Sequence, residues 1–326
     1  NGISGGGGNT SGAVSKSDVN FYDYDGTLLH SYSKSAFLAL SALPDLPTRE
    51  GLTCQGWNYT LAKAKNYVTA NGKLDIGAMY ITDDGKTRLY IRIAAKGRMT
   101  VPLYFSQTVA NGVTIDWGDG SATQTLSGMG NKNTTHTYTE IGEYTISLNP
   151  TSGCTLGLGY SSYCVMGNGG NAGKVYCNML QAVEVGKNVT SIGYYAFYYC
   201  SSLASVVIPQ GVTSIGESAF KSCSSLESIT LPFVGNGSNK THFGYIFGAS
   251  SSSYNNDYVP TSLKSVTITG STSIGNSAFY GCSSLTSIII PNSVTSIGKS
   301  AFYGCSHLAN ITLPFVGDGI DQTHFG

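Results

Sequence analysis

Apolar and polar residues alternate in short runs through the second half of the chain, and these runs recur at a nearly constant spacing. The run at Leu203 reads L-x-x-V-x-I-P and is followed by V-T-S-I-G-x-S-A-F-x-x-C-S-S, and the other runs are near copies of this pattern. Apolar residues at every second position predict a strand with one buried face. The recurrence predicts a stacked solenoid, in which neighbouring units complete one core. The leucines that open the units lie 23, 23, 37, 22 and 23 residues apart: Leu180, Leu203, Leu226, Leu263, Leu285 and Leu308.

The alternation assigns each strand residue to one side of the predicted solenoid. In the second unit, Leu203, Val206 and Ile208 are expected to point inward, and Pro209 then ends the strand because it has no N–H donor. The outward residues form a candidate binding surface, since a curved solenoid sheet offers an extended face. One outward residue of each strand makes up the outer strand row: Val207, Thr230, Thr267, Ile289 and Thr312.

The 37-residue interval contains an insertion, and the insertion itself recurs. P-F-V-G-N-G-S-N-K-T-H-F-G begins at Pro232, and P-F-V-G-D-G-I-D-Q-T-H-F-G begins at Pro314. A longer unit of 82 residues, from Leu226 to Leu308, is therefore nested over the short one. Because the second copy of the insertion stops at residue 326, we expect the natural protein to continue.

The landmarks I-P, V-T-S-I-G, A-F and C-S-S-L together resemble the BspA-like leucine-rich repeat across residues 176–326. The resemblance implies a bacterial cell-surface or secreted, hence extracellular, protein that binds host or partner molecules. The expected function is that of an adhesin, which binds a host or partner protein or glycan through the solenoid. A non-binding structural spacer of a larger surface protein is the alternative.

Tyrosine recurs directly after the core phenylalanine of a unit, with Lys221 in its place in one unit. Aromatic side chains with hydroxyl tips are suited to contacts with proteins and sugars. They form the second candidate binding surface, although packing over the corners of the solenoid would explain them as well. Further tyrosines enlarge the group in the first unit, so that the whole set is Tyr194, Tyr195, Tyr198, Tyr199, Tyr280 and Tyr303.

Two segments precede the repeats. Residues 1–17 are Gly-rich and are expected to form a flexible linker. In residues 18–85, the pattern predicts a short strand at 19–29, a proline loop with a Gly-Trp strand at 44–58, and a helix from residue 61 that stops at Asn71 and Gly72. The strand, proline loop and Gly-Trp strand resemble the Listeria-Bacteroides repeat, which implies a β-grasp-like module; the helix departs from that pattern.

Residues 86–150 are expected to hold strands at 87–93, 99–105 and 113–120. D-W-G-D-G at 116–120 and H-T-Y-x-x-x-G-x-Y-T-I-x-L at 136–148 are similar to the polycystic-kidney-disease (PKD) domain. The similarity implies an immunoglobulin-like sandwich with Trp117 in its core and tyrosines at a strand corner. Residues 151–326 form the solenoid, with an irregular Gly-rich cap at 153–174. The predicted fold class is thus mainly β and multidomain.

Composition narrows the choice of partners. Charged residues make up 11% of the chain, against about 25% in an average protein, so the surface is neutral and rich in hydroxyl groups. Lys plus Arg number 18 and so do Asp plus Glu, which leaves no overall field to attract nucleic acid or an anionic membrane. No apolar run approaches the roughly 20 residues that span a bilayer, so no membrane insertion is expected in this fragment.

Four cysteines share one position of the repeat: Cys200, Cys223, Cys282 and Cys305. Adjacent units stack closely enough for disulfides, but we favour the interpretation that these are small buried thiols. The other cysteines lack C-x-x-C spacing or partnered histidines, so no metal site is expected.

One sequence resembles a catalytic motif. D-Y-D-G-T-L at residues 23–28 matches the nucleophile motif of the haloacid dehalogenase superfamily, which implies a phosphatase in which Asp23 attacks phosphorus and Asp25 is the acid/base beside magnesium. That chemistry needs a parallel α/β core, for which the segment as far as Asp83 and Asp84 is too short. A hairpin turn closed by Asp-Gly explains the same residues. We therefore expect no enzymatic activity and no cofactor.

Two smaller groups of polar residues have structural explanations. Asp116 and Asp119 would suit calcium, but they equally suit turns. The histidines lack a nucleophile nearby and are expected to bond loop carbonyls: His136, His242 and His324.

Overall fold

The computed structural model describes residues 15–23, 27–48, 52–57, 59, 61–82, 84–161, 163–168 and 175–315. The expected flexible linker at 1–17 lies outside these residues except for its last three. The chain is mainly β and divides into two compact units, Asn1–Asp83 and Asp84–Gly326. Within the described ranges, no helix combines the length and the apolar character that a bilayer span requires.

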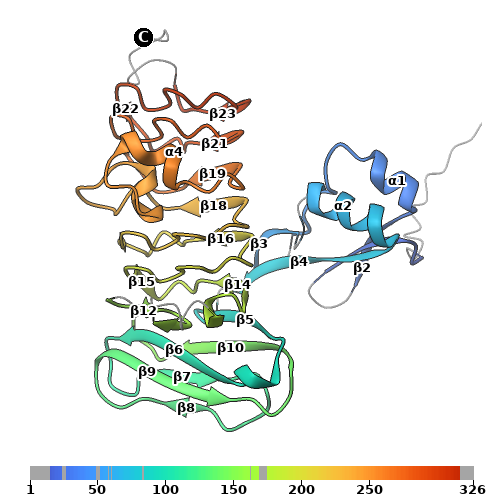
Figure 1. Cartoon of the computed structure of the whole chain (residues 1–326), viewed down its shortest axis with the longest axis vertical. Helices are drawn as coiled ribbons and strands as arrows, with labels where there is room; N and C mark the ends of the chain where they lie inside the picture. The colour runs from blue at the N-terminus through green and yellow to red at the C-terminus, as the bar shows by residue number, and fades with distance from the viewer. Residues whose placement is uncertain are drawn as a thin grey trace, which may run out of the picture. The chain divides into compact units, whose positions relative to one another are not determined.

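The first unit is a four-stranded sheet with two helices (Figure 1). The strand order is β2-β1-β4-β3; β1 and β4 are parallel and the other pairs are antiparallel. The elements are β1 (Val19–Tyr22), β2 (Leu28–Tyr32), α1 (Lys34–Ala39), β3 (Leu52–Trp57), α2 (Leu61–Asn71) and β4 (Leu74–Thr82).

The expectation of one strand at residues 19–29 is wrong, because the segment forms the antiparallel pair β1 and β2, in which Phe21 lies opposite His30. Pairing buries Phe21 against Trp57, with ring centroids 4.9 Å apart in an edge-to-face contact. The helix from residue 61 is confirmed as α2. It stops as expected: the Gly72 N–H donates to the Val68 carbonyl at 2.8 Å, and Gly72 has a φ of +82°.

The second unit begins with two five-stranded sheets. One has the order β14-β5-β10-β7-β8 and the other β17-β15-β11-β6-β9, so each sheet continues from residues 84–150 into the repeats. The predicted strands at 87–93, 99–105 and 113–120 are present as β5, β6 and β7. The elements are β5 (Thr87–Ile93), η1 (Lys96–Arg98), β6 (Thr100–Gln107), β7 (Val113–Asp116), β8 (Gln124–Thr125), β9 (Gly130–Thr137), β10 (Gly142–Pro150), β11 (Leu156–Leu158), β12 (Tyr163–Cys164), β13 (Gly167–Asn168), β14 (Leu180–Glu184), β15 (Val189–Ile192) and β17 (Ser214–Ile215).

The segment at 153–174, expected to be irregular, contains a strand that joins both parts of the second unit. Strand β11 pairs antiparallel with β6 and parallel with β15. Leu156 and Leu158 are buried, and Gly157 between them lets the neighbours approach, because a Cβ there would lie 2.5 Å from the Ser106 hydroxyl oxygen. The first leucine-led strand, β14, also differs from the later ones: it pairs antiparallel with β5.

The later units stack as one parallel sheet with the order β16-β18-β19-β21-β23 (Figure 1). Every pairing keeps equivalent repeat positions opposite each other. The inward residues of the second unit are buried as predicted, with Leu203, Val206 and Ile208 all at most 2% exposed. The strands are β16 (Ser205–Val207), β18 (Ser228–Leu231), β19 (Ser265–Ile268), β21 (Ser287–Ile289) and β23 (Asn310–Thr312).

The insertion is seated within the stack and continues one of its hydrogen-bond ladders. At the A-F corner, the Phe220 N–H donates to the Ile246 carbonyl and the Phe243 N–H donates to the Ala278 carbonyl, both at 2.8 Å. Among the described residues, the short strands of the V-T-S-I segments pair with one another as β15 with β17 and as β20 with β22. The remaining elements are η2 (Phe243–Phe247), η3 (Ser252–Tyr254), α4 (Asn255–Tyr258), β20 (Ser273–Ile274) and β22 (Ser296–Ile297).

Candidate functional site

The outer strand row lies on one face of the parallel sheet. Val207 pairs with Thr230, Thr230 with Thr267, Thr267 with Ile289, and Ile289 with Thr312 in the strand register. The structure therefore brings all the row's predicted residues into one line. Ile289 is 42% exposed, which is high for a large apolar side chain. A second outward line, two residues earlier in each strand, is also uncharged: Ser205, Ser228, Ser265, Ser287 and Asn310.

The tyrosines of the first complete corner form a contiguous group, the tyrosine cluster. The rings of Tyr194 and Tyr195 are 4.0 Å apart between centroids, those of Tyr195 and Tyr198 4.6 Å, and those of Tyr198 and Tyr199 4.4 Å. All of them are half-buried. The cluster thus offers a broad aromatic surface from one short segment.

Two members of this cluster have an unusual backbone. Tyr195 has a φ of +61° and Tyr199 a φ of +60°, both in the left-handed region. This region costs an L-residue with a side chain about 1–2 kcal/mol. At the equivalent positions the other described units place small residues with a similar φ: Ser218, Ser277 and Ser300 for the first position, and Ser222, Gly281 and Gly304 for the second.

The remaining predicted tyrosines form a separate pair. Tyr280 and Tyr303 stack with centroids 5.1 Å apart at an angle of 17°, and Tyr303 is 65% exposed. Between this pair and the tyrosine cluster lies Lys221, whose Nζ is 5.5 Å from the ring centroid of Tyr258 in the insertion. The tyrosine position of the repeat is therefore divided into two surfaces.

The environment of two tyrosines in the cluster, Tyr194 and Tyr198, favours the neutral phenol. A hydrogen bond with Tyr195, together with partial burial, raises the pKa of Tyr194 to about 12. Partial burial and the neighbouring Tyr199 also raise the pKa of Tyr198. Neutral phenols both donate and accept hydrogen bonds, so this surface suits uncharged polar ligands.

The family comparison agrees with the repeat pattern. A family model described as "BspA type Leucine rich repeat region" matches residues 175–256 and 249–326. Residues 175–326 are thus similar to a BspA-type leucine-rich repeat region, and we call their units the BspA-type repeats. No curated protein matches the chain significantly.

Solved structures with leucine-rich repeats are also similar to the chain. A leucine-rich repeat protein of Bacteroides ovatus is 31% identical over 43% of this chain and 32% of that chain, with a TM-score of 0.30. A leucine rich cell surface protein of Faecalibacterium prausnitzii is 27% identical over 41% and 48%, with a TM-score of 0.24. A leucine rich repeat protein of T. pallidum is 28% identical over 42% and 49%, with a TM-score of 0.19. The chain thus spans less than half the length of each.

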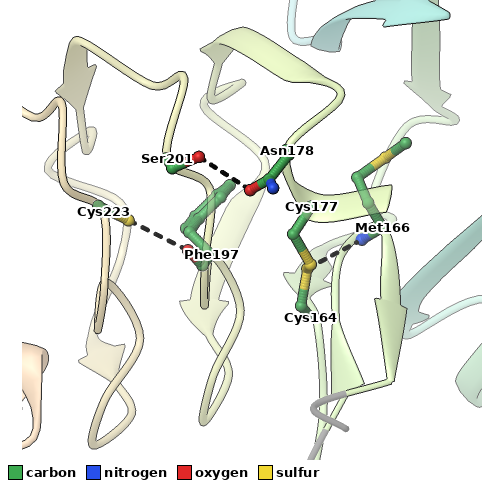
Figure 2. Close-up of a disulfide and its surroundings, with 7 residues drawn as sticks. All are labelled: Cys164, Met166, Cys177, Asn178, Phe197, Ser201 and Cys223. Atoms are coloured by element: carbon green, nitrogen blue, oxygen red, sulfur yellow. Dashed lines mark hydrogen bonds between the residues drawn. A yellow bond between two sulfur atoms is a disulfide. The ribbon is translucent and has the colours of Figure 1, made fainter. Parts of the chain in front are cut away.

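The cysteine position of the BspA-type repeats is occupied by free thiols. The Cys223 thiol donates to the Phe197 carbonyl at 3.1 Å, and the Cys305 thiol donates to the Phe279 carbonyl at 3.2 Å (Figure 2 for the first). Burial raises the pKa of Cys223 to about 12 and that of Cys305 to about 11. In the structure these thiols act as small side chains of the core, buried at Cys200, Cys223 and Cys282 and half-buried at Cys305.

A disulfide that sequence reasoning missed joins Cys164 to Cys177 (Figure 2). Cys164 belongs to β12, which precedes the BspA-type repeats, whereas Cys177 lies three residues before Leu180, where Cys200 lies before Leu203. The repeat alignment would therefore have assigned Cys177 to the repeat position. Nothing in the sequence identifies Cys164 as its partner, because the fold brings them together. The sulfur atoms of Cys164, Cys177 and Cys200 lie within 4.8 Å of one another.

The acidic residues of D-W-G-D-G hold turns. Asp116 accepts from the Gly118 N–H at 2.9 Å, and Asp119 accepts from the Ser121 N–H at 3.0 Å. The His136 Nε2 lies 2.7 Å from the Asp119 carboxylate, so the expectation that it bonds a loop carbonyl is wrong. The same expectation is confirmed for His242, whose Nε2 lies 2.9 Å from the Ala249 carbonyl oxygen. His324 lies outside the described residues.

The haloacid-dehalogenase-like motif is only partly described. Asp23 is buried at the end of β1, and its N–H donates to the Thr27 carbonyl at 2.8 Å. That bond closes the connection between the antiparallel strands β1 and β2, as the hairpin interpretation requires. Asp25 and Asp83 lie outside the described residues.

Proposed function

We propose that the chain is part of a bacterial cell-surface or secreted protein, and that its BspA-type repeat region is an extracellular solenoid that binds a partner protein or glycan. BspA-type leucine-rich repeat proteins are bacterial surface proteins. The balanced charge and the hydroxyl-rich outer strand row support a neutral contact surface in place of electrostatic capture.

The tyrosine cluster carries the proposal. Folding alone favours Ser or Gly at left-handed positions, as in the other units, yet this unit has Tyr195 and Tyr199 there. Backbone strain that folding does not require is concentrated at functional sites. Tyrosine also supplies a large contact area with few rotatable bonds, which is why it is frequent among residues that dominate binding energy.

The outer strand row provides a second set of contacts on the same rod. Its residues are repeated along five strands, so weak contacts to a repetitive partner add through effective concentration. The exposed Ile289 lies on β21, the fourth of the five strands, and offers the largest apolar side chain of the row.

The preceding segments serve in this proposal as stalk or spacer modules. The burial of Trp117 and the hydrogen bond from the Tyr138 hydroxyl to its carbonyl support a PKD-like sandwich at residues 86–150. The mixed sheet of the first unit with α2 on the chain between β3 and β4 supports a β-grasp-like module at residues 18–85.

The proposal is non-enzymatic. A phosphatase of the haloacid dehalogenase type needs a parallel sheet, and the sheet that bears Asp23 has a single parallel pair, β1 with β4. Magnesium-dependent hydrolysis of p-nitrophenyl phosphate that is abolished by Asp23→Asn would contradict this part of the proposal.

The test is retention of the full chain on an array of extracellular host proteins and glycans. The chain should bind at least one member, and the double variant Tyr195→Ser with Tyr198→Ser should lose that binding at least tenfold. Tyr254→Ser is the matched control, because Tyr254 is 49% exposed in the insertion and belongs to neither surface. If the wild type, the double variant and the Tyr254→Ser control are all retained equally, the contact lies outside the tyrosine cluster. No retention of the wild type would favour the structural spacer.

A further inference from the structure

The ladder of V-T-S-I strands is interrupted at the insertion. In the pair β15 and β17, the Thr213 N–H donates to the Thr190 carbonyl at 2.9 Å, and the Gly216 N–H donates to the Ile192 carbonyl at 2.8 Å. The pair β20 and β22 repeats both bonds with the N–H groups of Thr295 and Gly298 as donors, at the same distances. Between β17 and β20 there is no such pairing in the described part of the chain.

The interruption leaves two backbone donors without their usual acceptors. Thr272 and Gly275 occupy the positions that Thr213 and Gly216 occupy one unit earlier. Among the described residues, neither of their N–H groups has a hydrogen-bond acceptor. A backbone N–H without an acceptor costs free energy unless water or a ligand bonds to it. The N–H groups of Thr272 and Gly275 can therefore bind polar groups of a ligand.

A groove of about 500 Å³ lies over this interruption. Its lining comes from Val212 and Thr213 just before β17, from residues 270–273 and Gly275 around β20, and from the P-F-V-G insertion between them. Phe233 contributes a half-buried ring, and Gln210 contributes an amide. Six hydroxyl-bearing residues line the groove: Thr213, Ser238, Thr241, Ser271, Thr272 and Ser273.

The lining of this groove, which we call the neutral groove, contains no charged residue. A second groove of the same unit, of about 340 Å³, differs in this respect because Lys221 and Asp257 line it. A sugar ring presents alternating hydroxyl and C–H surfaces. The neutral groove matches them with hydroxyl groups that donate and accept, one aromatic ring and free backbone N–H groups.

We propose that the neutral groove binds an uncharged saccharide. The ring of the sugar lies against Phe233, and its hydroxyl groups bond the Thr241 and Ser273 side chains and the exposed N–H of Thr272. The site shares no residue with the tyrosine cluster or the outer strand row, so this proposal and the proposed function fail separately.

A peptide added as a further strand fits the groove less well. The insertion already covers both edges: a Cβ on Gly237 would lie 2.6 Å from the Thr213 carbonyl oxygen, and one on Gly275 would lie 2.8 Å from the Thr241 Cβ. An extra strand needs about 4.8 Å on each side, so it would have to displace the insertion.

The groove-forming sequence is itself repeated. Pro232, Phe233 and Thr241 recur 82 residues later as Pro314, Phe315 and Thr323. Of that second copy only its first two residues are described. A longer array of such units would carry one saccharide site per 82 residues, which is a spacing that suits a polymeric glycan.

The test is native affinity electrophoresis of the full chain in gels that contain dextran, mannan, laminarin or neutral arabinoxylan, with heparin as the charged comparison. At least one neutral polysaccharide should retard the wild type, and heparin should not. Phe233→Leu, which keeps the apolar volume, and Thr241→Val, which keeps the shape, should each weaken retardation at least tenfold. Thr295→Val, at an exposed threonine of the same motif outside the groove, should have no effect, and neither should Tyr303→Ser.

Amide hydrogen exchange supplies the second readout. The saturating polysaccharide should slow exchange at Thr272 and Gly275 at least fivefold in the wild type, and Thr241→Val should reduce that protection. The proposal is overturned if none of the four neutral polysaccharides retards the chain, or if the Thr295→Val control loses binding as Thr241→Val does. It is also overturned if an extended Val-Thr peptide, instead of the polysaccharides, protects these two amides.

Discussion

The Tyr138 hydroxyl donates a hydrogen bond of 2.8 Å to the backbone carbonyl of Trp117. Both residues are at most 2% exposed. The bond links Trp117, which follows strand β7, to Tyr138, which follows strand β9. The Trp117 ring also stacks on the His136 ring, with centroids 4.8 Å apart. A single hydroxyl thus satisfies a carbonyl that would otherwise be buried without a partner.

Replacing Tyr138 with Phe should lower the free energy of unfolding of the second unit by about 1–2 kcal/mol, because the Trp117 carbonyl is left buried and unpaired. Urea unfolding followed by tryptophan fluorescence measures this. The chain has two tryptophans, so a Trp57→Phe background makes Trp117 the sole reporter. Tyr144→Phe is the control, since the bond of Tyr144 to the Glu140 carbonyl is exposed and should matter less. Equal losses in the two variants would refute the role of the buried bond.

The Asp119 carboxylate should make stability depend on pH. Hydrogen bonds from Ser121 and His136 lower its pKa to about 2, from an ordinary value of 3.8. A carboxyl with a depressed folded-state pKa stabilises the fold above its unfolded pKa, and this contribution is lost as the pH falls from about 4 to about 2. Melting temperatures between pH 6 and pH 2 should therefore fall more steeply for the wild type than for Asp119→Asn below pH 4. Parallel curves would show that Asp119 does not carry the effect.

The corner glycine of the BspA-type repeat should be intolerant of a side chain. A Cβ on Gly216 would lie 2.4 Å from the Tyr194 backbone nitrogen, and the same short contact recurs at Gly298, so the backbones of adjacent units must move apart. Gly216→Ala should cost about 2–3 kcal/mol in urea unfolding. At Gly97 a Cβ meets nothing within 4 Å, so Gly97→Ala should stay within about 0.5 kcal/mol of the wild type. An equally stable Gly216→Ala variant would show that the corners are not closely stacked.

The repeat sequence predicted this stacking well because its information is local and reiterated. The alternation predicted Leu203 and Val206 inside and Val207 outside, and the structure confirms this. The pattern is specific because a shift of one residue would expose the whole buried side of the strand. The glycine of V-T-S-I-G permits close approach between units, a role that only the three-dimensional stack reveals.

Features that depend on contacts between distant residues were not predictable. Strand β11 could not be predicted from its Gly-rich segment, because its short apolar run forms a strand by pairing with β6 and β15, which are distant in the sequence. The disulfide of Cys164 with Cys177 and the neutral groove depend in the same way on which elements the fold brings together. The tyrosine cluster was visible as sequence, but the left-handed backbone of Tyr195 was not.

The disulfide should stabilise the junction between β12 and the first repeat. It closes a loop with a sequence separation of 13, for which the loss of chain entropy in the unfolded state corresponds to about 3 kcal/mol. Dithiothreitol should therefore lower the melting temperature of the wild type. It should leave the double variant Cys164→Ala with Cys177→Ala unchanged, because the repeat thiols are already free. Insensitivity of the wild type to dithiothreitol would contradict the pairing, which peptide mapping without reduction tests directly.

The tyrosine cluster should show opposite effects of glycine at adjacent positions. Tyr195→Gly removes the cost of a side chain in the left-handed region, about 1–2 kcal/mol, against a loss of about 0.5–1 kcal/mol from the greater freedom of glycine in the unfolded chain. The variant should thus be as stable as the wild type or up to about 1.5 kcal/mol more stable, while its binding falls. Tyr194 has no positive φ, so in Tyr194→Gly nothing offsets the entropic cost and the lost ring contact with Tyr195, and the variant should be destabilised. If Tyr195→Gly proved the less stable of the two, the cluster would be retained for packing, and the argument from backbone strain to recognition would fail.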